Sequence, residues 1–137
     1  MTDLYLTYEE RSHGGDPIDP SDRWTDHEDE YVDFYPKQLY SSEDKVPGWL
    51  KETLYDVDAQ QGDLVHLLVV RYTTGSTFGT SYGHWYIEGV YKDAKEATEI
   101  ADKIRTGTYK QEGRTYLPWE GYFERLEDIQ IYSLIVL

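Results

Sequence analysis

The sequence predicts an α+β protein, with an antiparallel sheet of four or five strands and one main helix, at about residues 93–106, packed on one face of the sheet. Three observations predict this class. Strand-length runs rich in β-branched and aromatic residues occur in both halves of the chain, one later segment has helical periodicity, and no repeated strand–helix–strand alternation is present. The length of 137 residues suits a single domain over residues 1–137, with an acidic, loop-rich region at about 11–47.

The N-terminal half contains the weaker patterns. Residues 4–10 alternate apolar and polar side chains, which predicts a short strand at the edge of the sheet. Residues 31–35 predict a second strand, and Pro36 is expected to end it because proline cannot donate a hydrogen bond to a neighbouring strand. Residues 12–29 lack periodicity and carry glycines and prolines, so we expect a loop. Residues 47–54 begin with Pro-Gly-Trp-Leu and predict one or two helical turns.

The strands of the C-terminal half are predicted more sharply. Residues 63–72 (DLVHLLVVRY) are nearly continuously apolar and β-branched, which is typical of a strand that is central or covered on both faces. Residues 84–91 form a second run, and the Gly/Ser/Thr-rich residues 73–83 lie between the two. We therefore expect an antiparallel hairpin with a long loop. Residues 129–137 (IQIYSLIVL) predict a further buried strand.

The helix at 93–106 is predicted by its start signal and its periodicity. Asp93 is suited to cap the first turn, and Glu96 three residues later completes a capping-box pattern. Small and apolar residues recur at helical spacing on one face, namely Ala94, Ala97, Ile100, Ala101 and Ile104. The alanines allow this face to approach a sheet closely.

The charge is distributed unevenly along the chain. The whole chain carries a formal charge of −14, and the first 47 residues contribute 13 acidic against four basic residues, which is 4 − 13 = −9 of that total. Carboxylates at this density repel one another unless a cation or a basic partner neutralises them. The 14 tyrosines and four tryptophans argue against disorder, because disordered acidic chains are poor in aromatic residues.

The composition also excludes several classes of function. The chain has no cysteine, which rules out disulfides, thiolate catalysis and thiolate metal sites. No apolar run approaches the roughly 20 residues of a membrane span, and the acidic N-terminus does not resemble a secretory signal. The acidic charge opposes direct binding to nucleic acid or to anionic lipid. We expect a cytoplasmic protein, located in the cytoplasm of the host cell if a phage encodes it.

The acidic region suggests two kinds of ligand. Six aspartates and His27 offer oxygen and nitrogen ligands, but their spacing is not that of a calcium-binding EF-hand loop, so we expect no metal site. Carboxylates held along a surface can instead imitate nucleic-acid phosphates and occupy a basic protein groove, with aromatic residues as buried anchors. The residues expected to contact such a partner are Asp22, Trp24, Asp26, Glu28, Asp29, Glu30, Tyr31, Asp33 and Tyr35.

The Gly/Ser/Thr-rich segment suggests a different, small-molecule site. It leads into a strand and contains no lysine, so it is neither a phosphate-binding P-loop nor a dinucleotide fingerprint. It could still form a ligand-binding hairpin loop in which aromatic rings stack on a base or sugar. The residues expected in this alternative site are Arg71, Thr77, Tyr82, His84 and Trp85.

No motif of an enzyme is present. The chain has no G-x-S-x-G or H-E-x-x-H sequence, and His66 lies in an apolar strand, where a histidine is usually structural. The leading hypothesis is therefore a non-enzymatic acidic binding protein without a cofactor. We expect an inhibitor of the kind that phages or mobile elements use, occupying a basic, nucleic-acid-handling site on a host protein. The alternatives are a nucleotide-binding, sponge-like protein and a structural component with a tyrosine-rich oligomer interface.

Overall fold

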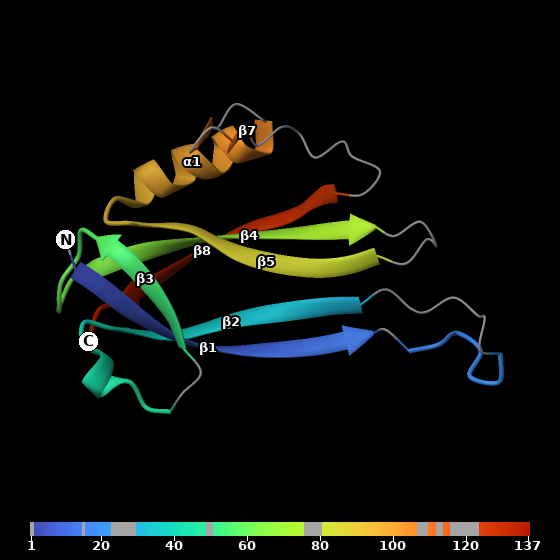
Figure 1. The fold of residues 1–137 in the computed structure, drawn as a ribbon. Coiled ribbons are helices and arrows are strands. Elements are labelled where there is room, and N and C mark those ends of the chain that lie inside the picture. Colours follow the sequence, from blue (N-terminus) through green and yellow to red (C-terminus); the bar gives the residue numbers. More distant parts are fainter. Residues whose placement is uncertain are drawn as a thin grey trace.

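The computed structural model describes residues 2–14, 16–22, 30–48, 51–75, 81–106, 110–111, 114–115 and 124–137. Within these ranges the chain is mostly strand, with one α-helix (Figure 1). Its elements, in chain order, are β1 (Thr2–Gly14), β2 (Glu30–Tyr40), the 3-10 helix η1 (Glu43–Lys45), β3 (Lys51–Val57), β4 (Leu64–Gly75), β5 (Ser81–Tyr91), α1 (Ala94–Thr106), β6 (Lys110–Gln111), β7 (Arg114–Thr115) and β8 (Glu124–Ile135).

The six long strands form two three-stranded antiparallel sheets. One sheet has the order β3-β1-β2 and the other β5-β4-β8, while β6 and β7 make a separate two-stranded pair. A parallel pairing between Glu30 of β2 and Tyr82 of β5 joins the two sheets edge to edge. A second parallel bridge connects Leu39 with Val136. The strand β2 therefore touches the other sheet near both of its ends.

The first hydrophobic core is formed by residues of both sheets. Leu4 and Leu6 of β1 and Phe34 of β2 pack in one cluster with Leu67 and Val69 of β4. All five are buried. Phe34 stacks on Trp85 of β5, with ring centroids 4.0 Å apart and planes inclined by 24°. This stack connects the β1–β2 hairpin to the β4–β5 hairpin.

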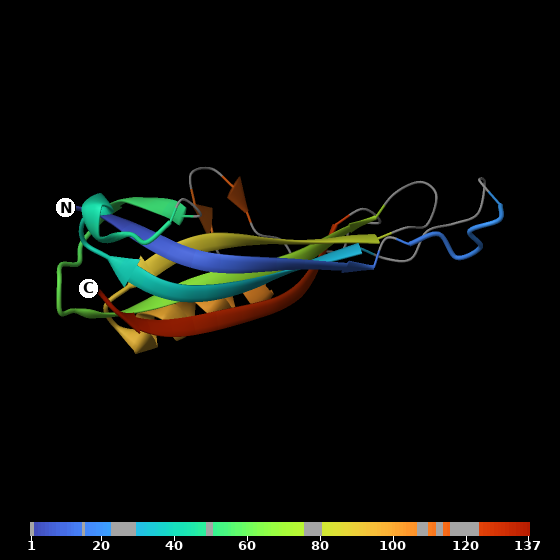
Figure 2. The same ribbon diagram turned by 90° about the horizontal axis from the view of Figure 1, so that it is seen from below.

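The helix α1 covers the opposite face of the β5-β4-β8 sheet (Figures 1 and 2). Because side chains alternate along a strand, Leu68 and Val70 of β4 point away from the first core and pack with Ala101 and Ile104 of α1. The near-continuous apolar run of β4 is thus explained by burial on both faces, as the sequence predicts. The helix prediction is also confirmed, although Ala94 is exposed while Ala97, Ala101 and Ile104 are buried.

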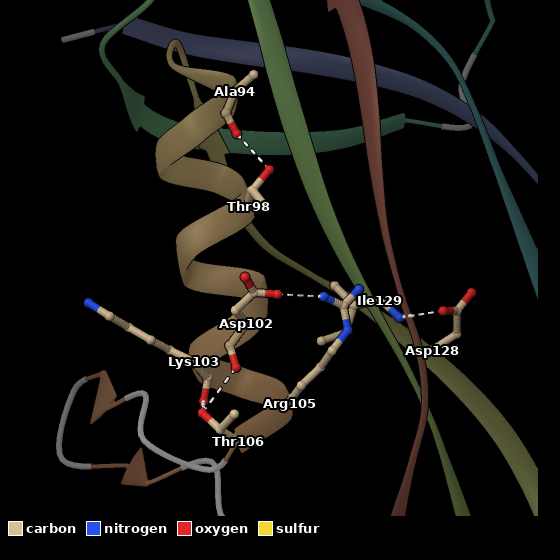
Figure 3. Close-up of polar contacts among 8 residues, drawn as sticks. All are labelled: Ala94, Thr98, Asp102, Lys103, Arg105, Thr106, Asp128 and Ile129. Carbon is tan, nitrogen blue, oxygen red and sulfur yellow. Dashed lines mark hydrogen bonds and ion pairs between the residues drawn. The ribbon is translucent and has the colours of Figure 1, made fainter.

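Polar contacts complete the two ends of α1. The Asp93 carboxylate accepts a hydrogen bond from the Lys95 backbone N–H at 2.9 Å, which caps the first turn. Figure 3 shows the contacts further along the helix, where the Arg105 guanidinium pairs with the Asp102 carboxylate at 3.0 Å. The Thr106 hydroxyl donates to the Asp102 carbonyl, also at 3.0 Å. These contacts lie on the exposed side of the helix and leave its alanine face to the sheet.

The predicted hairpin and the predicted C-terminal strand are present, but the expectation that this strand is buried is wrong, because Ile131 and Ile135 are exposed on one face of β8. The number of strands is also higher than predicted. The strands β4 and β5 pair as an antiparallel hairpin, and β8 pairs with β4 along almost its whole length. The prediction of four or five strands in one sheet was too low. The six long strands include β3, which occupies a segment predicted to be helical.

The helical prediction at residues 47–54 is wrong over the part that the structure describes. Residues 51–57 form β3, which pairs with β1, so that Leu54 lies beside Leu4 and contributes to the first core. The β-branched and aromatic residues of this segment favour a strand once a partner strand is available. Asp56 has φ of 52° beside a register shift, and its N–H donates to the Asp3 carboxylate at 3.2 Å. Trp49 and Leu50 lie outside the described residues.

Two further expectations about the N-terminal strands are wrong. The strand β1 is central, between β3 and β2, and it continues to Gly14 instead of ending near residue 10. Pro36 does not end β2 but lies inside it, at a β-bulge where Tyr8 pairs with Pro36 and Thr7 pairs with Gln38. A bulge tolerates a proline because the ladder of backbone hydrogen bonds is already interrupted there.

Candidate functional site

The two hairpins end at the same end of the molecule, away from both termini (Figures 1 and 2). The pairing of Glu30 with Tyr82 brings the beginning of β2 against the beginning of β5. Gly83 makes this approach possible, because a Cβ at this position would lie 2.8 Å from Cδ1 and 3.3 Å from Cα of Tyr31. The acidic region and the Gly/Ser/Thr-rich hairpin, which the sequence presents as alternative sites, are therefore neighbours. We call this part of the molecule the hairpin end.

A cleft of about 270 Å³ lies at the hairpin end, between the β1–β2 and β4–β5 hairpins. Five strands contribute to it, and its walls carry acidic, basic, histidine and tyrosine side chains. The lining residues are His13, Tyr31, Val32, Asp33, Arg71, Tyr72, Thr73, Gly83, His84 and Glu127. Its volume is slightly below the usual range of ligand pockets, which is about 300–1,000 Å³.

An ion pair crosses the cleft. The Arg71 guanidinium of β4 donates to the Asp33 carboxylate of β2, and about a quarter of each side chain is exposed. The second oxygen of Asp33 lies 3.3 Å from His13 Nδ1 of β1. Arg71 follows the buried residues Leu67 and Val69 along β4, so the apolar core between the sheets gives way to a charged contact at this end.

Four of the lining residues form two pairs of rings, one pair on each hairpin. The His13 and Tyr31 rings are stacked, with centroids 5.3 Å apart and planes inclined by 24°. On the other hairpin, the Tyr72 and His84 rings lie 5.2 Å apart with planes inclined by 31°. Each pair joins two adjacent strands, because His13 pairs with Tyr31 and Tyr72 pairs with His84 in the register of the sheets. The rings are thus held by backbone pairing.

A bulge in β8 supplies a second acidic group to the cleft, besides Asp33. Arg71 pairs with Asp128 and Tyr72 pairs with Leu126, so Glu127 is the extra residue of the strand. A bulge redirects side chains at the point where it occurs. The Asp128 carboxylate accepts the Ile129 backbone N–H at 2.8 Å beside this bulge (Figure 3). Glu127 lines the cleft as a result.

The acidic loop has local order where the structure describes it. The Asp22 N–H donates to the Asp19 carbonyl at 3.1 Å, which closes a turn with Pro20 at its second position. The Asp19 carboxylate accepts hydrogen bonds from the Ser21 N–H at 3.0 Å and the Ser21 hydroxyl at 2.7 Å. These bonds lower the pKa of Asp19 below its ordinary value, because they favour the ionised form. Asp16, Asp19 and Asp22 are exposed.

An apolar side chain accompanies these carboxylates. Ile18, between Asp16 and Asp19, is 64% exposed. We call residues 16–22 the acidic tip; the segment contains three aspartates and no lysine or arginine. Sequence reasoning did not single out Ile18, although an isoleucine between two Asp-Pro pairs, far from any periodic segment, was a signal for an exposed apolar residue.

The residues predicted to contact a partner lie in different parts of the molecule. Tyr31 and Asp33 line the cleft, and Glu30 begins β2 beside Tyr82. Tyr35 is exposed, with the Arg11 guanidinium 5.4 Å from its ring centroid. Asp22 belongs to the acidic tip. Trp24, Asp26, Glu28 and Asp29 lie outside the described residues.

The residues predicted for a small-molecule site are only partly brought together. Arg71 and His84 line the cleft. Trp85 is not among the lining residues: its ring stacks on Phe34 in the first core, and its indole N–H donates to the Glu10 carboxylate at 2.7 Å. Thr77 and the side chain of Tyr82 lie outside what the structure describes. His13, Tyr72 and Glu127 were missed. His13 and Glu127 come near Arg71 only through the pairing of distant strands, and although Tyr72 directly follows Arg71 in β4, nothing in the sequence indicated that it borders a cleft.

His66 lies within β4, and its Nδ1 is 2.8 Å from the Ser133 hydroxyl of β8. Within the described ranges, no group of three histidine or carboxylate side chains is arranged to hold a metal ion. None of the helices in the described part of the chain is long and apolar enough to cross a bilayer.

Comparison of the chain with protein-family models, with curated protein sequences and with solved structures gave no match. The class of the protein therefore follows from its fold and from the hairpin end alone. It is an α+β protein in which two three-stranded sheets, one covered by a helix, carry a cleft and an acidic tip at one end.

The Asp33–Arg71 pair is expected to stabilise the contact between the hairpins. We expect Asp33→Ala to lower the free energy of unfolding by about 1–2 kcal/mol, because it leaves the partly buried Arg71 without its partner. Arg71→Met in the same chain should restore part of this loss, since no unpaired charge remains. Urea unfolding of the single and double variants measures the coupling. If the losses in the free energy of unfolding of the two single variants add up to that of the double variant, the ion pair contributes nothing to stability.

Proposed function

We propose that the protein is a non-enzymatic binding protein that uses the acidic tip to occupy a basic site on a nucleic-acid-handling protein, and so inhibits it. The observation that carries this proposal is the composition of the tip: three exposed aspartates surround the exposed Ile18, with no basic residue in the segment. Carboxylates on a protruding loop can enter a groove built for phosphates, and an apolar residue among them can fill a pocket at the centre of the contact.

The residues around the acidic tip favour the interpretation that it binds a partner over the interpretation that it is only a solvated surface. In β1, the Glu9 carboxylate is neutralised within the chain. It lies 3.3 Å from the Lys37 ammonium and 3.6 Å from the Arg11 guanidinium. The net charge of the N-terminal third is therefore concentrated beyond these pairs. The Asp19–Asp22 turn constrains the backbone that carries two of the carboxylates, so less conformational entropy is lost when a partner binds.

The proposal is tested with purified nucleases, polymerases and RNA-guided effectors that have basic nucleic-acid channels. We expect at least one of them to bind the protein, with an affinity that falls about tenfold or more between 50 and 300 mM salt, because salt screens exposed charges. Nucleic acid should compete for the same site and activity should fall with occupancy. Absence of binding across the panel, or binding that salt and nucleic acid leave unchanged, would refute the proposal.

Variants of the tip make the test specific. Asp16→Lys with Asp22→Lys should reduce binding by about tenfold or more, since both charge reversals fall in the contact. The matched control, Glu96→Lys with Glu99→Lys, makes the same change in net charge on the exposed side of α1 and should have little effect. Ile18→Ser should weaken binding at high salt as well as at low salt, because its contribution is apolar. An equal loss of binding affinity in the tip variant and the helix variant would show that only the net charge of the protein matters for binding.

A further inference from the structure

The cleft is a second candidate site, separate from the acidic tip, because none of Asp16, Ile18 and Asp22 lines it. The groups that line it determine which ligands it suits.

The rings suit a planar ligand. The His13–Tyr31 and Tyr72–His84 pairs belong to different hairpins, so both hairpins contribute aromatic rings to the lining of one small cleft. Every nucleobase and similar heterocycle has a flat face that stacks on such rings. Histidine and tyrosine also provide polar atoms at their edges, which can bond to ring nitrogens and exocyclic groups.

The charges oppose an anionic ligand. Arg71 is the one basic side chain with a permanent charge among the described lining residues, and Asp33 already pairs with it. Within the described part of the chain, the Glu127 carboxylate has no ion-pair or hydrogen-bond partner. With neutral histidines, the lining residues that the structure describes therefore carry +1 from Arg71 and −2 from Asp33 and Glu127, which sums to −1. A phosphate would meet this charge in a chain whose total is −14.

An exposed carboxylate in an aromatic cleft is instead suited to N–H donors. The amino group of adenine, cytosine or guanine donates hydrogen bonds, and carboxylates accept them in nucleic-acid recognition. A protonated or permanently cationic heterocycle would gain in addition from the negative charge and from the ring faces. The volume of about 270 Å³ limits the ligand to one ring system with a small substituent.

We propose that this cleft binds a small planar nitrogen heterocycle that is neutral or cationic, a nucleobase or its nucleoside, and that it discriminates against the phosphorylated forms. The Glu127 carboxylate accepts the amino group of the ring, and the two ring pairs hold its faces. The sequence suggested a nucleotide as the alternative ligand. The negative charge of the cleft restricts this ligand to the base or the nucleoside, because it disfavours recognition of a phosphate.

The test uses the full chain and the nucleosides adenosine, guanosine, cytidine and uridine with their 5′-monophosphates. We expect at least one amino-bearing nucleoside to raise the melting temperature in a concentration-dependent way, since it binds only the folded state. Its monophosphate should bind about tenfold more weakly in titration calorimetry, because of the repulsion from Glu127 and Asp33. Uridine, whose ring lacks an amino group, should bind more weakly than cytidine.

A variant of the exposed Glu127 tests the recognition directly. Glu127→Gln should weaken nucleoside binding and reduce the discrimination against the monophosphate, while the control Glu96→Gln on α1 leaves both unchanged. Monophosphates that bind as tightly as nucleosides would overturn the charge argument. No binding of any nucleoside at millimolar concentration, with folding confirmed by circular dichroism, would overturn the site. Neither outcome depends on the protein partner of the acidic tip.

Discussion

Phe34→Ala is expected to lower the free energy of unfolding by about 3–5 kcal/mol, the largest loss from any single substitution considered for this protein. Phe34 is 2% exposed and stacks on Trp85 at 4.0 Å. Its ring also lies 5.5 Å from the Tyr8 ring and 6.4 Å from the Tyr132 ring. Truncation leaves a cavity among residues of four strands, in the core that holds the two sheets together. Urea or thermal unfolding measures the change.

The neighbouring residue provides the control. Tyr35 is also aromatic but is 43% exposed, and its contact with Arg11 is a cation–π contact on the surface. Tyr35→Ala should therefore cost about 0.5–1 kcal/mol. Phe34→Leu, which keeps most of the buried volume, should cost clearly less than Phe34→Ala. A similar loss for the alanine variants at positions 34 and 35 would contradict the assignment of Phe34 to the core.

Gly83→Val is expected to separate the two hairpins and lower the free energy of unfolding by about 1–3 kcal/mol. The new Cβ would lie 2.8 Å from Tyr31 Cδ1 and 3.3 Å from Tyr31 Cα. The Tyr31 ring and the backbone of β2 must therefore both move to make room for it. The preference of valine for strands acts in the opposite direction, but by no more than about 1 kcal/mol. The steric conflict should therefore decide the sign. Unfolding measurements and nucleoside titration of the variant check this.

A second substitution shows whether Tyr31 is the cause. In a Tyr31→Ala background, the atom nearest the new Cβ is absent, so Gly83→Val should cost less than it does in the wild-type chain. A valine variant as stable as the wild type would show that β2 and β5 do not approach each other closely at Gly83. An equal cost in both backgrounds would place the conflict in the backbone alone.

The parts of the fold with local signals could be predicted from the sequence. The helix at 94–106 has its own cap at Asp93 and its own apolar spacing, and the β4–β5 hairpin joins two strongly apolar runs that are adjacent in the chain. The predictions failed where a distant partner decides the structure. The segment of β3 becomes a strand because β1 pairs with it, and Pro36 remains inside β2 because a bulge accommodates it.

The candidate sites divide in the same way. The acidic region was evident from charge counts alone, because an excess of carboxylates is a property of composition. The cleft could not be predicted, since Asp33 and Arg71 are 38 residues apart and Glu127 enters only through a bulge in β8. Their positions depend on strand register, which a sequence without a known pairing does not specify.

The sequence by itself determined an acidic, cysteine-free α+β protein with one amphipathic helix, because composition and local periodicity depend only on neighbouring residues. Tertiary structure alone decided that there are two sheets, that the pairing of Glu30 with Tyr82 joins them, and that two suspected sites share one end. The physical reason is that long-range strand pairing and core packing select one arrangement among several that the local preferences allow.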